Sequence, residues 1–175
     1  MKDKHNLIEL IEQSTEKFEL QKDIEIEVEV FNKENGKIEL ETAPLKIDKI
    51  FSPTKLKRCI LEYITNSIEI KSKYSKNEEY IGVLEPYLIF MLIKHFSSLG
   101  EFMPTKIPEQ VALMNSMIDS SVLFQIMMEF EVGEIDRARE EVEIILAVFD
   151  SNMEEVEQIK KETRKFIKNK DLLDF

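Results

Sequence analysis

The spacing of hydrophobic residues changes within the first 50 positions, and the change predicts a helix followed by a hairpin. Apolar residues at intervals of three, four and seven predict an amphipathic helix over residues 4–20. From Asp23 onward apolar and acidic residues alternate strictly, as in a half-buried strand: Ile24, Ile26, Val28 and Val30 alternate with Glu25, Glu27 and Glu29. After a turn at Asn35-Gly36, the alternation resumes over residues 38–41, which predicts the second strand.

The length of the turn decides which side chains share a face of this hairpin. A two-residue loop at Asn35-Gly36 would put the apolar residues of the two strands on opposite faces. A three-residue loop over residues 34–36, with Gly36 left-handed, pairs Val30 with Leu40 and unites the apolar side chains. We therefore expect this second register. Glu29 then faces Glu41, and the outer face carries Glu25, Glu27, Glu29, Glu39 and Glu41.

Helical spacing dominates the rest of the chain. An irregular stretch over residues 45–50 leads to Ser52 and Pro53, and proline suits the first position of a helix because the N–H that it lacks would be unpaired there. The next helix covers residues 77–100, with Pro86 as a kink or a restart, and is apolar on every side from residue 87 to residue 96. We predict that it is the central helix of the core.

Four further helices are predicted beyond Pro108, separated at residues 119–121, at Gly133 and at the polar triplet 150–152. The last two form either an antiparallel pair or one long arm. The expected fold class is α+β and predominantly helical, a bundle of about five to seven helices with an N-terminal β-hairpin. We expect residues 1–50 to hold the first helix and the hairpin, and residues 51–175 to form the helical domain.

Charge and cysteine content narrow the partners and the compartment. The 35 acidic and 24 basic residues give a formal charge of −11, which repels nucleic acid and anionic membranes, so we expect neither as a partner. The N-terminus lacks the apolar stretch of a secretory signal, and the strongest apolar run, residues 87–93, is far shorter than the ~20 residues of a membrane span. With a single cysteine, the sequence favours a cytoplasmic protein.

The residues needed for common enzymatic chemistry are scarce. Cys59 lies on the apolar stripe of its helix and is expected to be a packing residue. The four glycines form no phosphate-binding loop, and the carboxylates near Glu140 have no histidine beside them, so we expect no cofactor, no metal and no catalytic residues. An enzyme would require a pocket that brings His95 to a carboxylate such as Glu85 or Glu62.

Two sets of residues are candidates for binding a partner protein. The hairpin carboxylates form either a solvated face that resists aggregation or a docking surface for a basic partner. The flexible side chains of Met117, Met127 and Met128 suit either an ordinary core or an adaptable apolar groove. We take both sets as the candidate interaction residues.

Three segments resemble a known class of proteins: FSPTKLKRCILEYI, YLIFMLIKHFSSL and IPEQVALMNSMIDSSVLFQIMMEF. In their pattern of helices and short capping loops, over roughly residues 50–150, they are similar to small helical proteins encoded among the structural genes of tailed bacteriophages, including tail assembly chaperones. The resemblance implies a non-enzymatic part in virion assembly or in the virion, through contacts with phage structural proteins. It also implies a location in the host cytoplasm or in the virion.

The sequence therefore predicts a non-enzymatic protein of phage assembly or of the virion that acts through protein–protein interactions. A homo-oligomer is one of the assemblies that we expect for it. The alternative is an acidic inhibitor or regulator of a basic protein, in which the hairpin carboxylates and the acidic residues of 129–157 imitate the charge of nucleic acid.

Overall fold

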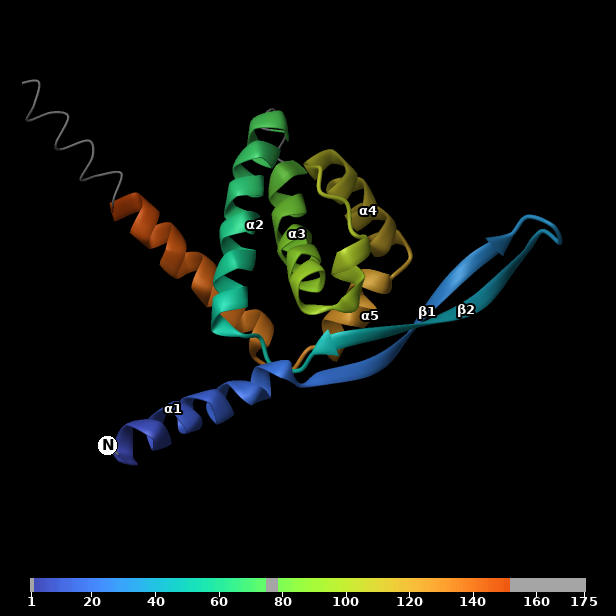
Figure 1. Ribbon diagram of the computed structural model, residues 1–175. Coiled ribbons are helices and arrows are strands. Elements are labelled where there is room, and N and C mark those ends of the chain that lie inside the picture. The colour runs from blue at the N-terminus through green and yellow to red at the C-terminus, as the bar shows by residue number, and fades with distance from the viewer. Residues whose placement is uncertain (1, 75–78, 152–175) are drawn as a thin grey trace, which may run out of the picture. The chain divides into compact units, whose positions relative to one another are not determined.

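The computed structural model describes residues 2–74 and 79–151 (Figure 1). The described residues belong to two units, one up to Ala138 and one from Arg139 onward. The first unit holds the hairpin and most of the helices, and the described part of the second, residues 139–151, is helical. The predicted fold class, α+β and mostly helical, is confirmed. The elements are α1 (Lys2–Thr15), the 3-10 helix η1 (Glu16–Glu19), β1 (Gln21–Asn32), β2 (Lys37–Asp48), α2 (Pro53–Tyr74), α3 (Glu79–Phe96), the 3-10 helix η2 (Ser98–Phe102), α4 (Ile107–Asp119) and α5 (Val122–Glu129), followed by a helix over residues 134–151.

Helix α3 is the centre of the core, as its apolar circumference predicts. Every residue from Tyr87 to Ile93 is buried, and Phe96 is completely inaccessible. Helix α2 packs along α3 and buries Leu56, Cys59 and Ile60 against it. Burial of each large apolar side chain stabilises the fold by roughly 1.5 to 3 kcal/mol relative to exposure, so this helix pair supplies much of the stability of the first unit.

Phe51 joins the end of the hairpin to the helices. Its buried ring stacks on Phe96 with 3.9 Å between ring centroids and meets the edge of Phe130 at 5.0 Å. Its backbone N–H donates to Glu134 Oε2 at 3.0 Å, and its carbonyl accepts from the guanidinium of Arg137. Both the ring and the backbone of this residue are therefore held, which fixes the point where the hairpin meets α2.

A buried polar chain connects α2, α3 and α4. The hydroxyl of Tyr87 accepts from Asn66 Nδ2 at 2.9 Å and donates to Gln110 Oε1 at 2.5 Å, and Gln110 Nε2 donates to the carbonyl of Pro104 at 2.9 Å. Burial raises the pKa of Tyr87 to about 12. The polar groups of this series of hydrogen bonds pair with one another. The buried amide of Gln110 therefore has partners, and its burial avoids the cost of an unpaired polar group.

The register of the hairpin differs from the expected one. Asn32 pairs with Lys37, so the loop has four residues rather than three, and Val30 lies opposite Glu39 instead of Leu40. The reason lies at the base of the hairpin, residues 21–27 and 42–48, where the helices cover one face. The observed register brings Ile24, Ile26, Leu45 and Ile47 together on that face, and all four are buried. The expected register would have turned Leu45 and Ile47 toward water.

The prediction of an irregular stretch at residues 45–50 is wrong for most of its length, because β2 continues to Asp48. Pro44 lies opposite Glu25. Glu27, two residues beyond Glu25 on β1, points its backbone N–H and carbonyl away from β2 and toward Gln125. Alternate residues of an antiparallel strand point their backbone groups the same way, so the missing N–H of Pro44 falls on the outer edge. The ladder loses no hydrogen bond, and the strand passes through the proline.

The tip of the hairpin is held by local hydrogen bonds. Gly36 has φ +69°, the left-handed conformation that the sequence predicts for it, and its N–H donates to the carbonyl of Asn32 at 2.8 Å. The carboxylate of Glu39 accepts from Asn35 Nδ2 at 2.6 Å and from Asn32 Nδ2 at 3.2 Å. These two amides lower the pKa of Glu39, with Asn35 contributing more. The turn is therefore built from its own side chains.

The breaks predicted in the second half of the chain are found in part. Ser121 separates α4 from α5 with φ 61°, although its side chain makes no capping hydrogen bond, and Gly133 has φ +90° before the next helix. Asp150 and Ser151 continue that helix rather than ending it. The helix predicted over residues 153–167 lies outside the described residues.

Two glycines provide a matched test of the packing between α3 and η2. A Cβ added to Gly100 would lie 1.9 Å from the carbonyl oxygen of Lys94, so we expect Gly100→Ala to lower the free energy of unfolding by more than about 2 kcal/mol. A Cβ at Gly82 meets nothing within 4 Å, and alanine favours a helix, so Gly82→Ala is expected to be neutral or stabilising by up to about 1 kcal/mol. Urea unfolding followed by circular dichroism measures both, and equal effects would contradict the packing described.

Candidate interaction surface

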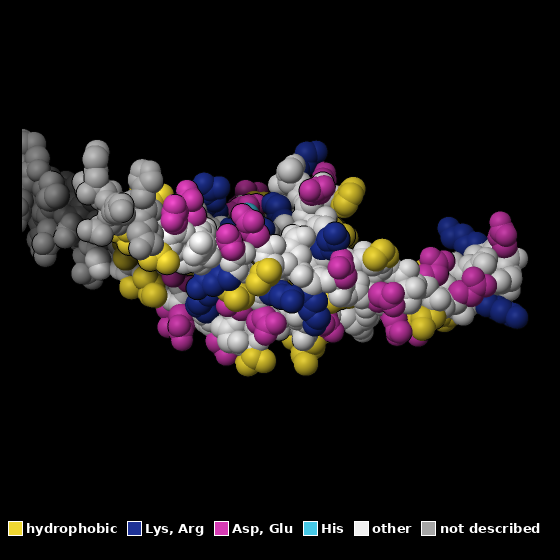
Figure 2. All heavy atoms as spheres, turned by 60° about the horizontal axis from the view of Figure 1, so that its bottom comes forward, with side chains coloured by type: hydrophobic (Ala, Val, Ile, Leu, Met, Phe, Trp, Pro, Cys, Tyr) yellow, Lys and Arg dark blue, Asp and Glu magenta, His cyan; other side chains and the backbone are white. Residues whose placement is uncertain are grey.

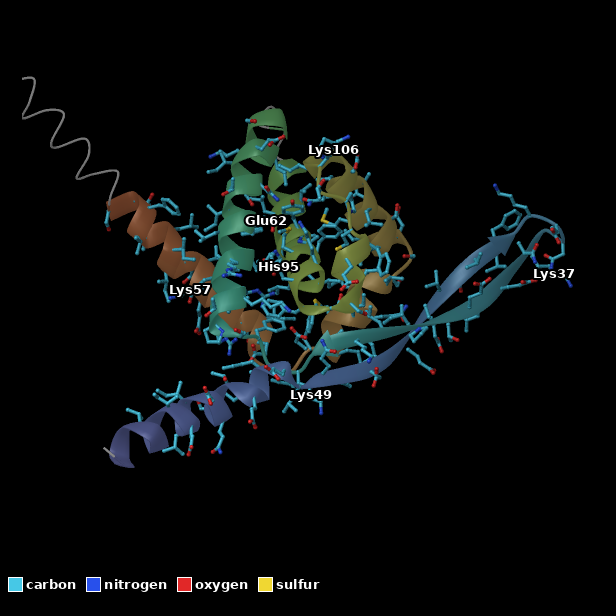
Figure 3. The ribbon with its side chains drawn as sticks, viewed as in Figure 1. Lys37, Lys49, Lys57, Glu62, His95 and Lys106 are labelled. Atoms are coloured by element: carbon cyan, nitrogen blue, oxygen red, sulfur yellow. The ribbon has the colours of Figure 1, made fainter. Side chains whose placement is uncertain are left out.

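The hairpin is buried at its base and exposed beyond it. Its distal half, residues 28–41, projects past the helices of the first unit (Figure 1), and no residue of this segment is buried. The tip, marked by Lys37 in Figure 3, lies far from the helices. The distal half is thus a two-stranded arm without a covering layer, an arrangement that is marginally stable in water unless something packs on it.

The register sorts the predicted carboxylates onto two faces. Glu25, Glu27 and Glu29 lie together on one side of β1, which we call the carboxylate face. Glu39 and Glu41 lie opposite Val30 and Val28, on the other side. The expectation of five carboxylates on one face, with Glu29 opposite Glu41, is therefore wrong, because the four-residue loop shifts β2 by one position.

The same shift brings apolar side chains onto the carboxylate face. Phe31 lies opposite Ile38, and Leu40 lies opposite Glu29. These three side chains are 61%, 67% and 61% exposed. Figure 2 shows hydrophobic side chains among the Asp and Glu side chains along the arm, with lysines at its tip. In the distal half, the carboxylate face is therefore a mixed apolar and acidic surface.

Gln125 of α5 binds the outer edge of β1. Its side-chain oxygen accepts from the N–H of Glu27 at 3.0 Å, and its amide nitrogen donates to the carbonyl of the same residue at 2.8 Å. The side chain of Gln125 thus takes the place of a peptide group of a neighbouring strand. It lies on the side of α5 that also carries Val122 and Ile126. Gln125 was not among the residues expected from the sequence to bind; its one signal is a polar residue between two apolar ones in a short helix.

Two grooves lie between this edge and the helices. The larger one, about 630 Å³, separates the arm from the turn between α4 and α5. Its lining is mostly polar and consists of Glu27, Glu29, Leu40, Ser116, Asp119, Ser120, Ser121 and Gln125. A second groove of about 400 Å³ runs beside α5 and brings Glu25 together with Met128, Phe124 and Glu129. Both grooves therefore carry carboxylates and exposed apolar side chains.

The three candidate methionines do not form a common groove. Met117 is buried in the core, Met127 is half-buried, and Met128 is 76% exposed. Only Met128 of the three is placed beside a hairpin residue of the candidate set, through the groove that it shares with Glu25. The sequence left an ordinary core and an adaptable groove open for these methionines, because which of them is covered depends on how α4 and α5 pack on the rest of the fold.

His95 does meet a carboxylate. Glu62 of α2 lies between Lys94 and His95 of α3, with its two oxygens 2.5 Å from Lys94 Nζ and 2.8 Å from His95 Nε2 (Figure 3). The hydrogen bond from His95 lowers the pKa of Glu62 to about 2, with Lys94 adding to the effect and burial opposing it. Each oxygen is therefore already paired, and a carboxylate of such low pKa is a weak base at neutral pH.

Cys59 is completely buried, and burial raises the pKa of its thiol. Among the described residues, no three His, Cys, Asp or Glu side chains are grouped so that they could hold a metal ion. No single helix of the described ranges is long and apolar enough to cross a membrane, and α4 and α5 pass that test only as a pair, by length and composition, with an 85° bend between them.

Comparison with known proteins places almost the whole chain in one family. The YomO family model matches residues 8–174. No curated protein and no solved structure matches the chain.

The Glu62 ion pairs predict a pH-dependent contribution to stability. We expect Glu62→Gln to lower the free energy of unfolding by about 1 kcal/mol at neutral pH, because the amide cannot form the two charged contacts. Ionised Glu62 stabilises the fold fully above its ordinary pKa of 4.5, and this contribution is lost as the pH falls toward about 2. The stability difference between the two proteins should therefore shrink below pH 4.5, as measured by urea unfolding.

Glu101→Gln is the matched control for this experiment. Glu101 is exposed on η2, so its substitution is expected to change the free energy of unfolding by less than about 0.5 kcal/mol at any pH in the range. A Glu62→Gln difference that stays constant between neutral pH and about pH 3 would show that the ion pairs do not stabilise the fold.

Proposed function

The chain belongs to the YomO family, a Bacillus phage-type protein family, and from this we propose that it is a non-enzymatic binding protein of phage assembly or of the virion. It is a phage-related protein. The proposed binding surface is the distal half of the hairpin. Within phage assembly, the resemblance of residues 50–150 to tail assembly chaperones favours a chaperone role in the host cytoplasm, and a place in the virion is the other outcome.

The exposed apolar residues of the arm carry this proposal. Phe31, Ile38 and Leu40 lie close together on a projecting hairpin, and each leaves most of its surface in water. Burial of apolar area contributes about 25 cal/mol per Å², so a partner that covers these residues gains affinity while it supports the hairpin. A clustered apolar surface on an unsupported arm suits a protein whose task is to dock.

The chemistry of the polar clusters supports a role without catalysis. Glu62 is held ionised by Lys94 and His95, so it lacks the pKa of an efficient general base. The Cys59 thiol is buried and its pKa is raised, which keeps it in the unreactive thiol form. Both groups therefore act in packing and stability in this proposal.

Mimicry of nucleic acid is the alternative, and the register makes it the weaker one. Glu39 and Glu41 lie on the opposite face from Glu25, Glu27 and Glu29, so the hairpin offers three aligned carboxylates rather than five. Apolar side chains also interrupt the carboxylate face in the distal half. A binding energy that is dominated by charge and collapses with added salt would favour mimicry over docking.

A photoreactive side chain at the arm tests the proposed function. We expect benzoylphenylalanine in place of Phe31 to form a covalent adduct with one phage structural protein in cells that produce the phage. The same side chain in place of Phe102 is the control, since Phe102 is also highly exposed but lies on η2, outside the hairpin. The adduct is identified by mass spectrometry.

Specific docking also predicts the effect of removing the apolar surface. The test uses a chain with benzoylphenylalanine in place of Leu40. In this chain we expect the double substitution Phe31→Ser with Ile38→Ser to abolish the adduct, while the helical circular dichroism stays unchanged. Absence of an adduct from position 31, or equal labelling from positions 31 and 102, would contradict the proposed function.

A further inference from the structure

We propose that the outer edge of β1, at Glu29 and Phe31, binds an extended, lysine- or arginine-bearing segment of the partner protein as a third strand. This inference rests on the proposed function and specifies the kind of partner and the way it binds. It draws on the direction of the backbone groups along β1, on Gln125, and on the charge of the adjoining groove.

The direction of the backbone groups along β1 follows from the two hydrogen bonds between Glu27 and Gln125. The N–H and carbonyl of Glu27 point away from β2, because both bond to Gln125. In an antiparallel ladder every second residue points its backbone groups the same way, so Glu29 and Phe31 also present their N–H and carbonyl groups at the outer edge. Within the described ranges, no hydrogen bond engages these groups of Glu29 and Phe31.

Gln125 shows how a third strand would begin. Its amide donates to and accepts from Glu27 as the peptide groups of an added strand would. The free edge starts two residues further on, at Glu29, whose backbone groups have no hydrogen-bond partner among the described residues. A partner segment that continues from Gln125 toward the tip would therefore extend an edge whose first pair of hydrogen bonds is already made.

The groove beside this edge selects the charge of the segment. Glu27, Glu29 and Asp119 all line the groove of about 630 Å³ between the arm and the turn from α4 to α5. A strand placed there turns every second side chain toward these carboxylates, which favours lysine or arginine at alternate positions. The side chains between them lie beside Val28 and Val30, which favours β-branched residues there.

Toward its base, the opposite edge of the hairpin is less suited to strand addition. On β2 the outward position at Pro44 has no N–H, and the N–H of Lys46 already donates to Ser98 Oγ at 3.2 Å. A second copy of this chain is also disfavoured at β1, because its own hairpin would bring carboxylates against carboxylates. Charge complementarity therefore selects a basic partner segment.

Synthetic peptides test the inference directly on the full chain. The probe is a fluorescein-labelled peptide of alternating lysine and valine, KVKVKVK, measured by fluorescence anisotropy at low and at physiological salt. We expect it to bind, and to shift the amide resonances of Glu29 and Phe31. Of two versions N-methylated at all lysines or at all valines, at least one should bind about tenfold more weakly, because methyl groups block the hydrogen bonds of one peptide edge.

A pair of charge reversals separates the groove from the rest of the hairpin. Glu29→Lys should weaken KVKVKVK binding by about tenfold, whereas Glu41→Lys, the same change on the opposite face, should leave it within about twofold. Both sites are exposed, so both variants are expected to fold, which circular dichroism checks.

Several results would overturn the inference. They are no binding of KVKVKVK at millimolar concentration, equal binding of the parent and both methylated peptides, and equal weakening by Glu29→Lys and Glu41→Lys. A dimer seen by sedimentation that Glu29→Lys dissociates would also overturn it, since a second copy would then occupy the edge. If any of these occurs while position 31 still forms its specific adduct, strand addition fails and the proposed function stands.

Discussion

The burial of four aliphatic side chains at the base of the hairpin sets the geometry on which the rest of the surface depends. Ile24 pairs with Leu45, Ile26 with Ala43, and Ile47 completes the buried set. Because side chains alternate along a strand, this choice at the base also determines every face further out. The carboxylates of β1 and the apolar residues near the tip consequently share a side, although nothing near the tip requires it.

The helical body can hold this base because its own packing is extensive. Helix α3 is surrounded on all sides, and Phe51 links the end of β2 to Phe96 and Phe130 through ring contacts. Glu134 and Arg137 bind the backbone of the same residue. Stability is thus concentrated in the helices and at the hairpin base, and the arm beyond Glu27 contributes little to it. A binding element is able to remain partly unsupported only when the body is stable without it.

The sequence predicts the parts of this structure that follow from local periodicity. The alternation from Ile24 to Val30, the all-round apolar character of residues 87–96 and the left-handed Gly36 each indicate one conformation, and each is found. The register is not predictable in this way, because the tip favours one pairing and the base another, and only the position of the helices shows which half is buried. The role of Gln125 likewise depends on a contact between residues 98 positions apart.

The self-contained turn at the tip has a consequence for how such an arm can vary in length. Asn32, Asn35 and Glu39 hold the turn without help from the helices. Two residues added to each strand would move the turn outward by about 7 Å and preserve the inside and outside of every position. One residue added to each strand would exchange the two sides beyond the insertion. Relatives with longer or shorter arms are therefore expected to differ by an even number of residues in each strand. The length of the arm then changes while every position keeps its face of the hairpin.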